Sequence, residues 1–293
     1  MRDSSSTPSP LRHRQVEVEG IEVHAVDGGA SDSPAVLFLH GWPEDWTAFE
    51  RIMTPLAERA HVVAIDLPGI GGSATPPGAN DKRTLARYVH GVIEVLGLRD
   101  ATLVGHDVGG MITYAYLRAY PDELARAVIM NTAIPGVAPW DEVKRNPHIW
   151  HFAFHAVPEL PEKLVAGREA AYFDFFYDAI AARPGAVAAS AREAYVEAYS
   201  RSEALHTGFE WYRAFPRDEA DNGAATGEPV LTPVLYLRGE HERGDMQEYL
   251  RGLRDAGVRD IRGAVVPGSG HFAPNERPDD VAALLRGFIG LER

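Results

Sequence analysis

Residues 101–109 read Ala-Thr-Leu-Val-Gly-His-Asp-Val-Gly. The apolar run 101–104 is typical of a buried strand, and the pattern that follows the glycines predicts a helix. Gly105 and Gly109 lie two positions before and two positions after Asp107. Small residues at these positions let a strand and a helix approach closely around a strained central residue. The sequence therefore predicts a nucleophile elbow with Asp107 at its tip.

The alternation of apolar strand and helix extends on both sides of this elbow. Apolar runs of strand length recur at 35–39, 62–65, 127–130, 233–237 and 262–266. Helical stretches are predicted at 48–59, 83–96, 109–119, 246–253 and 279–288. Continuous apolar strands joined by crossover helices are typical of a parallel sheet with helices on both faces. We therefore predict a mostly parallel, doubly wound α/β sheet, preceded by an edge hairpin over 15–26.

This alternation stops between residues 135 and 227, where aromatic residues and helix formers dominate. The segment predicts an α-helical cap inserted after the sixth strand of the core. The predicted divisions are a disordered tail over 1–14, a core in two parts over 15–136 and 229–293, and a cap over 137–228. The polar, glycine-containing stretch 217–228 is predicted to be the linker that returns the chain to the core.

The composition limits the kinds of partner and chemistry. The chain has 29 Lys and Arg against 42 Asp and Glu, and the formal charge of −13 opposes binding to nucleic acid or to anionic membrane surfaces. It contains no cysteine, which excludes a thiol nucleophile and a cysteine-ligated metal. The N-terminal residues lack the apolar core of a signal peptide, and no apolar run approaches about 18 residues. We expect a cytoplasmic protein, and the sequence leaves a homodimer open.

A second motif follows the apolar run 35–39 and reads His40-Gly41-Trp42-Pro43. Gly41 allows a tight turn directly after the strand. The backbone N–H of Trp42 then lies at the same edge of the sheet as the elbow. The N–H groups of Trp42 and Val108 are therefore predicted to form an oxyanion hole, since such holes combine the residue after the nucleophile with an early strand-end loop.

A third signal is His271, in Gly-Ser-Gly-His-Phe just past the last predicted strand. It occupies the final place in the chain order of nucleophile, acid and histidine. The acid is expected in the acidic loop 238–245, after the run 233–237. We prefer Glu242 by its position in that loop, with Glu240 and Asp245 as alternatives.

Together these motifs resemble those of the α/β-hydrolase superfamily, and within it those of the epoxide hydrolases, over about residues 15–290. His40-Gly41-Trp42-Pro43 resembles the His-Gly-x-Pro motif of that family, and Gly105-His106-Asp107 resembles its aspartate elbow. The resemblance implies an α/β-hydrolase fold with a helical cap. It also implies hydrolysis of an epoxide to a vicinal diol without a metal or another cofactor.

The resemblance assigns two residues of the cap. Epoxide hydrolases usually hold the epoxide oxygen with two tyrosines, and the segment around Tyr212 resembles the one that carries the second. His151 occupies the position of the first, as in a subset of bacterial members with a His/Tyr pair. That subset can place its acid after the sixth strand, where this chain has Asn131, which strengthens the case for Glu242. We expect the substrate to contact Trp42, Phe152, His155 and Trp211.

An aspartate nucleophile indicates attack on saturated carbon. A carboxylate is already ionised at neutral pH, so it can form an alkyl ester directly, whereas a serine attacks acyl carbon after losing its proton. Asp107 therefore argues against a lipase or an esterase. His271 would then activate the water that hydrolyses the ester on Asp107.

Two alternative functions remain. Haloalkane and haloacid dehalogenases use the same aspartate route, but haloalkane dehalogenases generally carry a halide-binding tryptophan at the position of Val108. Fluoroacetate dehalogenases carry arginines near the elbow, where this chain has Val108 and Met111. A non-catalytic small-molecule-binding protein of the same fold is the other alternative, since a fold does not determine function.

Overall fold

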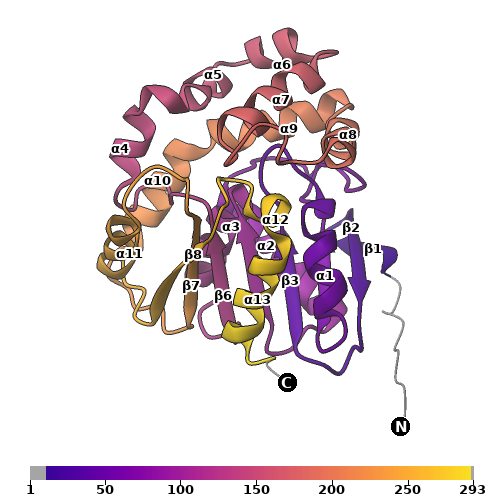
Figure 1. The fold of residues 1–293 in the computed structure, drawn as a ribbon, viewed down its shortest axis with the longest axis vertical. Coiled ribbons are helices and arrows are strands. Elements are labelled where there is room, and N and C mark those ends of the chain that lie inside the picture. Colours follow the sequence, from indigo (N-terminus) through magenta and orange to yellow (C-terminus); the bar gives the residue numbers. More distant parts are fainter. Residues whose placement is uncertain (1–10, 292–293) are drawn as a thin grey trace.

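The computed structural model describes residues 11–291, which form one eight-stranded sheet beneath a helical cap (Figure 1). The strand order is β1-β2-β4-β3-β5-β6-β7-β8, and the sheet is parallel from β4 to β8. The strands are β1 Arg12–Val18, β2 Ile21–Gly28, β3 Ala35–Leu39, β4 His61–Ile65, β5 Thr102–His106, β6 Arg126–Met130, β7 Val234–Gly239 and β8 Ile261–Val266. Strands β1 and β2 form the antiparallel hairpin at one edge.

Helices cover both faces of the sheet, which explains why the central strands are apolar throughout. All residues of β3, β4 and β5 are buried. The core helices are η1 Trp46–Phe49, α1 Glu50–Leu56, α2 Lys82–Leu96, α3 Val108–Ala119, α11 Met246–Asp255, α12 Ala273–Glu276 and α13 Pro278–Ile289. Helices α1 and α13 pack together on the near face in Figure 1, and α2 packs against α3 on the other face.

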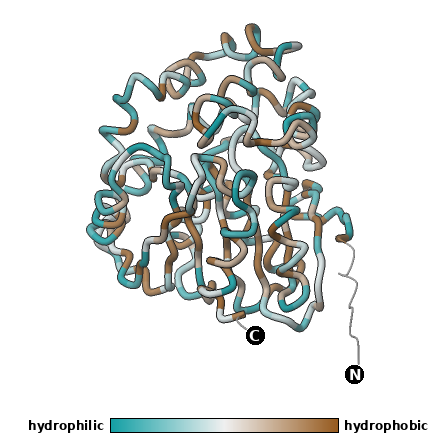
Figure 2. Tube along the Cα trace, viewed as in Figure 1, coloured by the Kyte–Doolittle hydropathy of each residue, from teal (hydrophilic) through white to brown (hydrophobic). Residues whose placement is uncertain are grey.

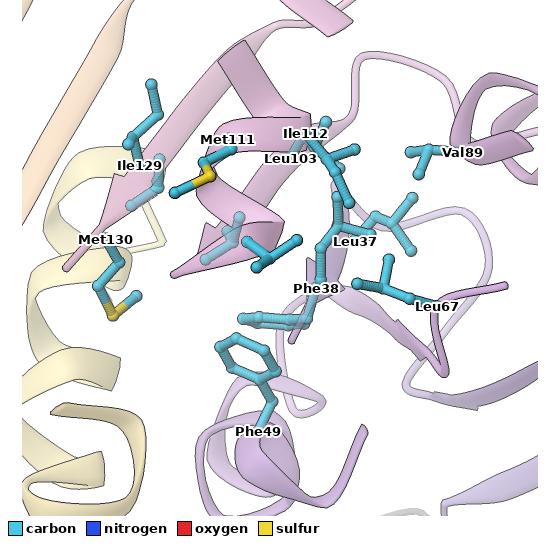
Figure 3. Packing of buried hydrophobic residues seen from close by; sticks show 14 of the residues in the cluster. Leu37, Phe38, Phe49, Leu67, Val89, Leu103, Met111, Ile112, Ile129 and Met130 are labelled. Atoms are coloured by element: carbon cyan, nitrogen blue, oxygen red, sulfur yellow. The ribbon is translucent and has the colours of Figure 1, made fainter. Parts of the chain in front are cut away.

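The hydrophobic core lies between these layers. Figure 2 shows hydrophobic residues concentrated along the strands. In Figure 3, Phe38 of β3 faces Phe49 at the end of η1, and their ring centroids are 4.9 Å apart. Leu103 of β5 and Ile112 of α3 fill the opposite face. The elements that carry the motifs are therefore anchored by fully buried side chains.

The predicted α/β-hydrolase architecture is confirmed. Between β6 and β7 the chain forms a group of helices, which we call the cap. The cap consists of α4 Trp140–Arg145, η2 Pro147–Ile149, α5 His151–Ala156, α6 Leu160–Val165, α7 Glu169–Ala179, α8 Ala189–Ala198, α9 Ser202–Arg213 and α10 Phe215–Ala224. These helices lie over one end of the sheet, at the top of Figure 1. Among the residues that the structure describes, none of the helices has both the length and the apolar character needed to cross a membrane.

Two predicted boundaries differ from the structure. The disordered tail was predicted over residues 1–14, but strand β1 begins at Arg12, so residues 12–14 belong to the sheet. Residues 1–10 lie outside the part of the chain that the structure describes. The reason is pairing with β2, where Arg12 is opposite Asp27 and the Arg14 guanidinium donates to the Asp27 carboxylate at 2.5 Å.

The predicted linker 217–228 is also wrong over most of its length, because it forms the larger part of α10. Two of its polar residues, Asp218 and Asn222, are buried. Asp218 accepts the backbone N–H of Lys82, and the Asn222 amide donates to the carbonyl of Pro135 at 2.8 Å. Tertiary hydrogen bonds thus hold a segment whose composition is typical of a turn.

The turn between β5 and α3 leaves no space for side chains at its two glycines. A Cβ atom on Gly105 would lie 2.1 Å from the carbonyl oxygen of Gly109. A Cβ atom on Gly109 would lie 2.2 Å from the carbonyl oxygen of Leu39 in β3. The elbow therefore depends on the absence of side chains at both positions.

We predict that Gly109→Ala lowers the free energy of unfolding by about 1–3 kcal/mol or more, because the new methyl group would overlap the backbone. The matched control is Gly223→Ala in α10, where a Cβ atom meets nothing within 4 Å. There alanine should raise the stability by about 0.5–1 kcal/mol. Denaturant unfolding followed by circular dichroism measures both changes, and equal stability of Gly109→Ala and the wild type would contradict the prediction.

Candidate active site

Asp107 lies at the junction of β5 and α3 in a backbone conformation with φ 49° and ψ −118°. This region is rarely occupied by residues other than glycine, and it projects the carboxylate beyond the end of the sheet. The Trp42 N–H donates to Asp107 Oδ1 at 2.9 Å. Burial raises the pKa of Asp107, but the neighbouring His271 and the Trp42 N–H outweigh it and lower the pKa to about 2.

The loop after β3 lies directly against the elbow. A Cβ atom on Gly41 would be 2.5 Å from the Asp107 Cβ, so only glycine fits there. His40 is buried beneath the loop, where its Nε2 accepts the Leu67 N–H at 3.0 Å and its Nδ1 is 2.8 Å from the Gly41 carbonyl. These partners require a neutral ring with the proton on Nδ1. The loop is therefore fixed from below and brings the Trp42 N–H to the carboxylate.

Val108 is the first residue of α3 and is buried. Its N–H belongs to the first turn of the helix, whose donors lack intrahelical acceptors. The structure thus places the two N–H groups expected for an oxyanion hole on the two segments that meet at Asp107.

His271 lies between two carboxylates. Its Nε2 is 3.5 Å from Asp107 Oδ2, and its Nδ1 is 3.3 Å from Glu242 Oε1. Burial lowers the pKa of His271, but the two carboxylates outweigh it and raise the pKa to about 10. The ring is therefore charged at neutral pH while Asp107 is ionised.

Of the three carboxylates considered in the loop after β7, Glu242 is the one beside His271. Glu240 instead accepts the N–H of Gly268 at 2.8 Å, and Asp245 caps α11 by accepting the Gln247 N–H at 2.9 Å. The preference for Glu242 over its two neighbours therefore agrees with the geometry.

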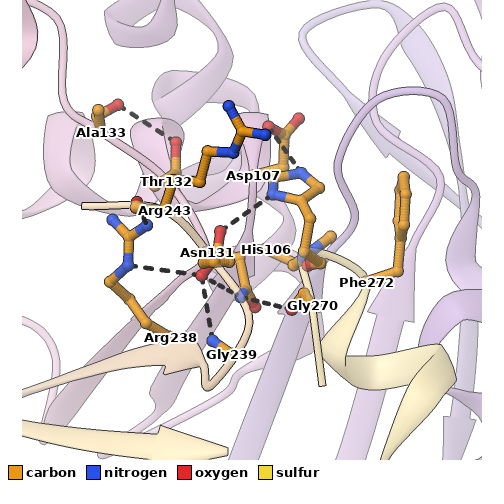
Figure 4. Close-up of polar contacts among 12 residues, drawn as sticks. His106, Asp107, Asn131, Thr132, Ala133, Arg238, Gly239, Arg243, Gly270 and Phe272 are labelled. Atoms are coloured by element: carbon orange, nitrogen blue, oxygen red, sulfur yellow. Dashed lines mark hydrogen bonds and ion pairs between the residues drawn. The ribbon is translucent and has the colours of Figure 1, made fainter. Parts of the chain in front are cut away.

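Glu242 is held by two donors that the sequence analysis did not assign, Asn131 and Arg238. Both donors are labelled in Figure 4. The Asn131 amide donates to Glu242 Oε2 at 2.7 Å, and the Arg238 Nε is 3.5 Å from the same oxygen. The Arg238 guanidinium also lies 4.1 Å from the ring centroid of Tyr249. Burial raises the pKa of Glu242, but His271 and Arg238 outweigh it, so the net shift is downward. Asn131 is therefore a donor to the acid.

A second buried pair supports the site from below. The His106 Nδ1 is 2.7 Å from Glu44 Oε2, and its Nε2 is 2.8 Å from the carbonyl oxygen of His271. Glu44 also accepts the N–H of Gly41 and the amide of Asn275, both at 3.1 Å. Each of these partners can donate a hydrogen bond to Glu44, as suits a carboxylate. Both nitrogens of His106 face an acceptor, so the ring carries a proton on each and is an imidazolium.

Burial lowers the pKa of His106, but the charge of Glu44 outweighs it, so the pKa is raised overall. The pair joins the loop after β3, the elbow and the segment that carries His271. The sequence analysis assigned no role to His106 or to Glu44. The sequence does carry a signal for this pair, because each motif has an ionisable residue directly beside it. Glu44 follows Pro43, and His106 precedes Asp107.

Tyr212 and His151 come from the cap and face Asp107 across a cavity. Their ring centroids lie 5.6 Å and 6.2 Å from the Trp42 ring, and 5.8 Å from each other. No hydrogen-bond partner is found for the Tyr212 hydroxyl among residues 11–291. Burial and the charge of Asp107 raise the pKa of Tyr212 well above its usual value, and burial lowers the pKa of His151 to about 4. At neutral pH both rings are therefore uncharged hydrogen-bond donors.

The cavity measures about 670 Å³ and reaches from the elbow to the cap. Its lining includes Asp107, His271, Glu242, Tyr212, His151, Trp42 and Phe152. Other lining residues are aromatic, such as Trp150, Phe175 and Phe176, and others are charged, such as Arg243 and Glu248. This composition suits an uncharged organic molecule at the inner end.

Two residues expected to contact the substrate do not line the cavity. Trp211 precedes Tyr212 on α9, and neighbouring residues of a helix point about 100° apart, so Tyr212 faces the cavity while Trp211 is buried near His40. His155 is buried behind Tyr212, with its Nε2 2.7 Å from the Tyr172 hydroxyl. Both residues therefore support the wall of the cavity from outside.

In the described part of the chain no group of three or more His, Asp or Glu side chains is arranged to hold a metal ion.

Comparison with known proteins identifies the family. A family profile described as alpha/beta hydrolase fold matches residues 34–278, which is most of the chain. The chain belongs to the α/β-hydrolase fold family. Asp107, the loop that carries Trp42, and His271 lie after strands β5, β3 and β8, at the same end of the sheet.

The relatives of this α/β hydrolase carry two kinds of name. The soluble epoxide hydrolase of Corynebacterium sp. (strain C12) is 29% identical over 285 residues, covering 95% of this chain and 97% of that protein. The fluoroacetate dehalogenase of Burkholderia sp is 30% identical over 301 residues, covering 95% and 94%. The crystal structure of Cfl2 from Burkholderia cenocepacia superposes with a TM-score of 0.86 at 33% identity, covering 95% of each chain. The family and the name of the epoxide hydrolase support hydrolase activity for this chain.

We predict that Asp107→Asn lowers the pKa of His271, because the substitution removes one of the two carboxylates that favour the charged ring. An NMR titration of the His271 Hε1 resonance, assigned by its loss in His271→Gln, measures this. The wild-type midpoint is expected at about pH 10, and the variant midpoint lower. An unchanged His271 midpoint would show that Asp107 does not hold the proton there.

Proposed function

We propose that this α/β hydrolase converts an epoxide to a vicinal diol through an ester on Asp107. The observation that carries the proposal is an ionised carboxylate at the elbow facing, across an aromatic cavity, a tyrosine hydroxyl without a protein partner. A carboxylate nucleophile and a weakly acidic proton donor are the two groups that opening a three-membered ether requires.

In the first step an oxygen of Asp107 attacks an epoxide carbon and forms a C–O ester bond. The bond between that carbon and the epoxide oxygen breaks, and the oxygen takes the proton of Tyr212. The raised pKa keeps Tyr212 protonated until it reacts, and an alkoxide can still take its proton because an alcohol is an even weaker acid than a phenol. The neutral His151 donates a hydrogen bond to the same oxygen, since its lowered pKa leaves it without a proton to transfer at neutral pH.

Formation of the ester prepares the second step. It removes the negative charge of Asp107, which is one of the groups that hold the proton on His271. The pKa of His271 therefore falls, and the proton it releases balances the one that Tyr212 has given up. The neutral His271, oriented by Glu242, can then take a proton from water.

The activated water attacks the ester carbonyl of Asp107. The oxyanion that forms is stabilised by the N–H groups of Trp42 and Val108, which need not move because both belong to rigid strand-end turns. Collapse of this intermediate breaks the bond between the carbonyl carbon and the alkyl oxygen. That oxygen takes the proton of the hydroxyl group that water left on the carbonyl carbon, so the diol is released and the carboxylate is restored. One hydroxyl oxygen of the diol therefore comes from Asp107, which keeps the oxygen of water in its place, and the other comes from the epoxide.

Dehalogenation is the second candidate, because a relative at 30% identity is named fluoroacetate dehalogenase. It would use the same Asp107 ester, with Tyr212 and His151 as donors to a halide. Against a haloacid, the elbow offers the uncharged Met111 to the cavity. Of the two arginines that line the cavity, Arg238 is paired with Glu242. We therefore favour the epoxide.

The direct test incubates the protein with small panels of aryl and alkyl epoxides, haloalkanes and fluoroacetate. Diol is measured by mass spectrometry and halide by ion chromatography, with Asp107→Asn as the control. Diol formation that Asp107→Asn loses supports the proposal, whereas halide release without diol identifies a dehalogenase. A non-catalytic binding protein would yield neither product.

We predict that Tyr212→Phe reduces kcat/KM for the epoxide by about 100-fold, because the departing oxygen loses its proton donor. The matched control is Tyr120→Phe, remote from the cavity on the C-terminal side of α3, which should leave the rate unchanged. Steady-state kinetics on purified proteins compare the two. An unchanged rate for Tyr212→Phe would remove Tyr212 from the mechanism.

A further inference from the structure

Lys82, the first residue of α2, is a buried cation at the boundary between core and cap. Its Nζ lies 2.9 Å from Asp218 Oδ2 in α10, and the two side chains are each only 2% exposed. The Lys82 backbone N–H also donates to Asp218 Oδ1 at 2.8 Å, so a carboxylate of the cap closes the N-terminus of a core helix. Two bonds thus join these residues across the domain boundary.

The same ammonium group holds the end of α9. It donates a hydrogen bond to the carbonyl oxygen of Trp211, which belongs to the last turn of that helix. The last four carbonyls of a helix lack intrahelical donors, and a cation there is favourable. The N–H of Ala214, which follows α9, donates to the carbonyls of Glu210 and Tyr212 and not to that of Trp211. Lys82 therefore supplies a donor where α9 needs one.

Tyr212 lies between the two groups that Lys82 contacts. On one side is Trp211, bound through its carbonyl, and on the other is Phe215, whose ring centroid is 4.7 Å from the ammonium nitrogen. The Phe215 ring in turn packs edge-on against Tyr212, with centroids 5.2 Å apart. Because the Tyr212 hydroxyl has no partner among residues 11–291, backbone and ring packing alone set its direction.

Stability alone does not account for such a pair. Burying two charges costs desolvation free energy that their attraction only roughly offsets, and apolar side chains of similar size often do as well. An apolar pair could not donate a hydrogen bond to the Trp211 carbonyl, as Lys82 does. The neighbouring core–cap pair differs in this respect, since Arg217 Nε lies 3.5 Å from Asp81 with its own side chain 64% exposed.

We propose that Lys82 and Asp218 are a positioning pair that fixes Tyr212 toward the departing oxygen, an inference that rests on the proposed role of Tyr212 as proton donor. Lys82 of the core thereby fixes the position of Tyr212, which belongs to the cap. Lys82 touches neither substrate nor reacting atoms and acts through α9.

The test separates the two chemical steps. Lys82→Met combined with Asp218→Asn removes both charges, so that no unpaired carboxylate remains buried. Rapid-quench mass spectrometry measures the rate of ester formation on Asp107 and the rate of its hydrolysis. We expect ester formation to slow by about 10- to 100-fold, the scale of a misplaced catalytic group. Hydrolysis of the ester should be unchanged, because it uses His271 and Glu242.

Two further variants complete the design. Arg217→Gln, which removes the exposed pair one residue away, should change neither rate. In a Tyr212→Phe background the double substitution should cause no further loss of ester formation, because residues that act through one another are not additive. A merely structural role would instead slow both steps or add to the loss.

The inference is overturned if the double variant forms the ester at the wild-type rate, or if both steps slow equally. Should the double variant fail to fold, Lys82→Arg keeps the charge while displacing the donor, and it must show the same selective loss. Wild-type protein that forms no ester would instead refute the proposed function, so the two failures are distinguishable.

Discussion

The close approach of β3, β5 and α3 around Asp107 is the constraint on which the site depends. Three glycines, at positions 41, 105 and 109, lie where a Cβ atom would come within 2.5 Å of the Asp107 Cβ or of backbone. This packing forces Asp107 into a left-handed conformation at the end of a buried strand. The carboxylate is consequently held against the Trp42 N–H before any substrate binds, so little reorganisation is needed during reaction.

Buried carboxylates and histidine rings alternate around Asp107. Glu44 pairs with His106, Asp107 with His271, and His271 in turn with Glu242. A buried carboxylate without such partners would be protonated and would lose its nucleophilic character. The alternation therefore keeps Asp107 ionised and gives the site a means of changing the charge of His271, since an ester on Asp107 removes one neighbour of the ring.

Much of this could be predicted from the sequence because short-range constraints dominate at strand ends. The glycine spacing around Asp107, the turn at Gly41 and the order of Asp107, Glu242 and His271 each correspond to a local geometric need. The remainder depends on tertiary contacts. The polar composition of 217–228 favours a linker, yet Asp218 and its neighbours are held by the core; likewise, only the orientation of α9 shows that Tyr212 faces the cavity while Trp211 faces away. The roles of Glu44 and Asn131 required partners distant in sequence.

The measurement that most directly tests the central claim is the intact mass of His271→Gln after incubation with a small panel of aryl and alkyl epoxides. Without His271 the ester should form but not be hydrolysed, so the protein is expected to gain the mass of one epoxide. Asp107→Asn combined with His271→Gln should gain none. Diol production by the wild type together with no adduct on His271→Gln would contradict the account, because it would indicate that water opens the epoxide without an ester on Asp107.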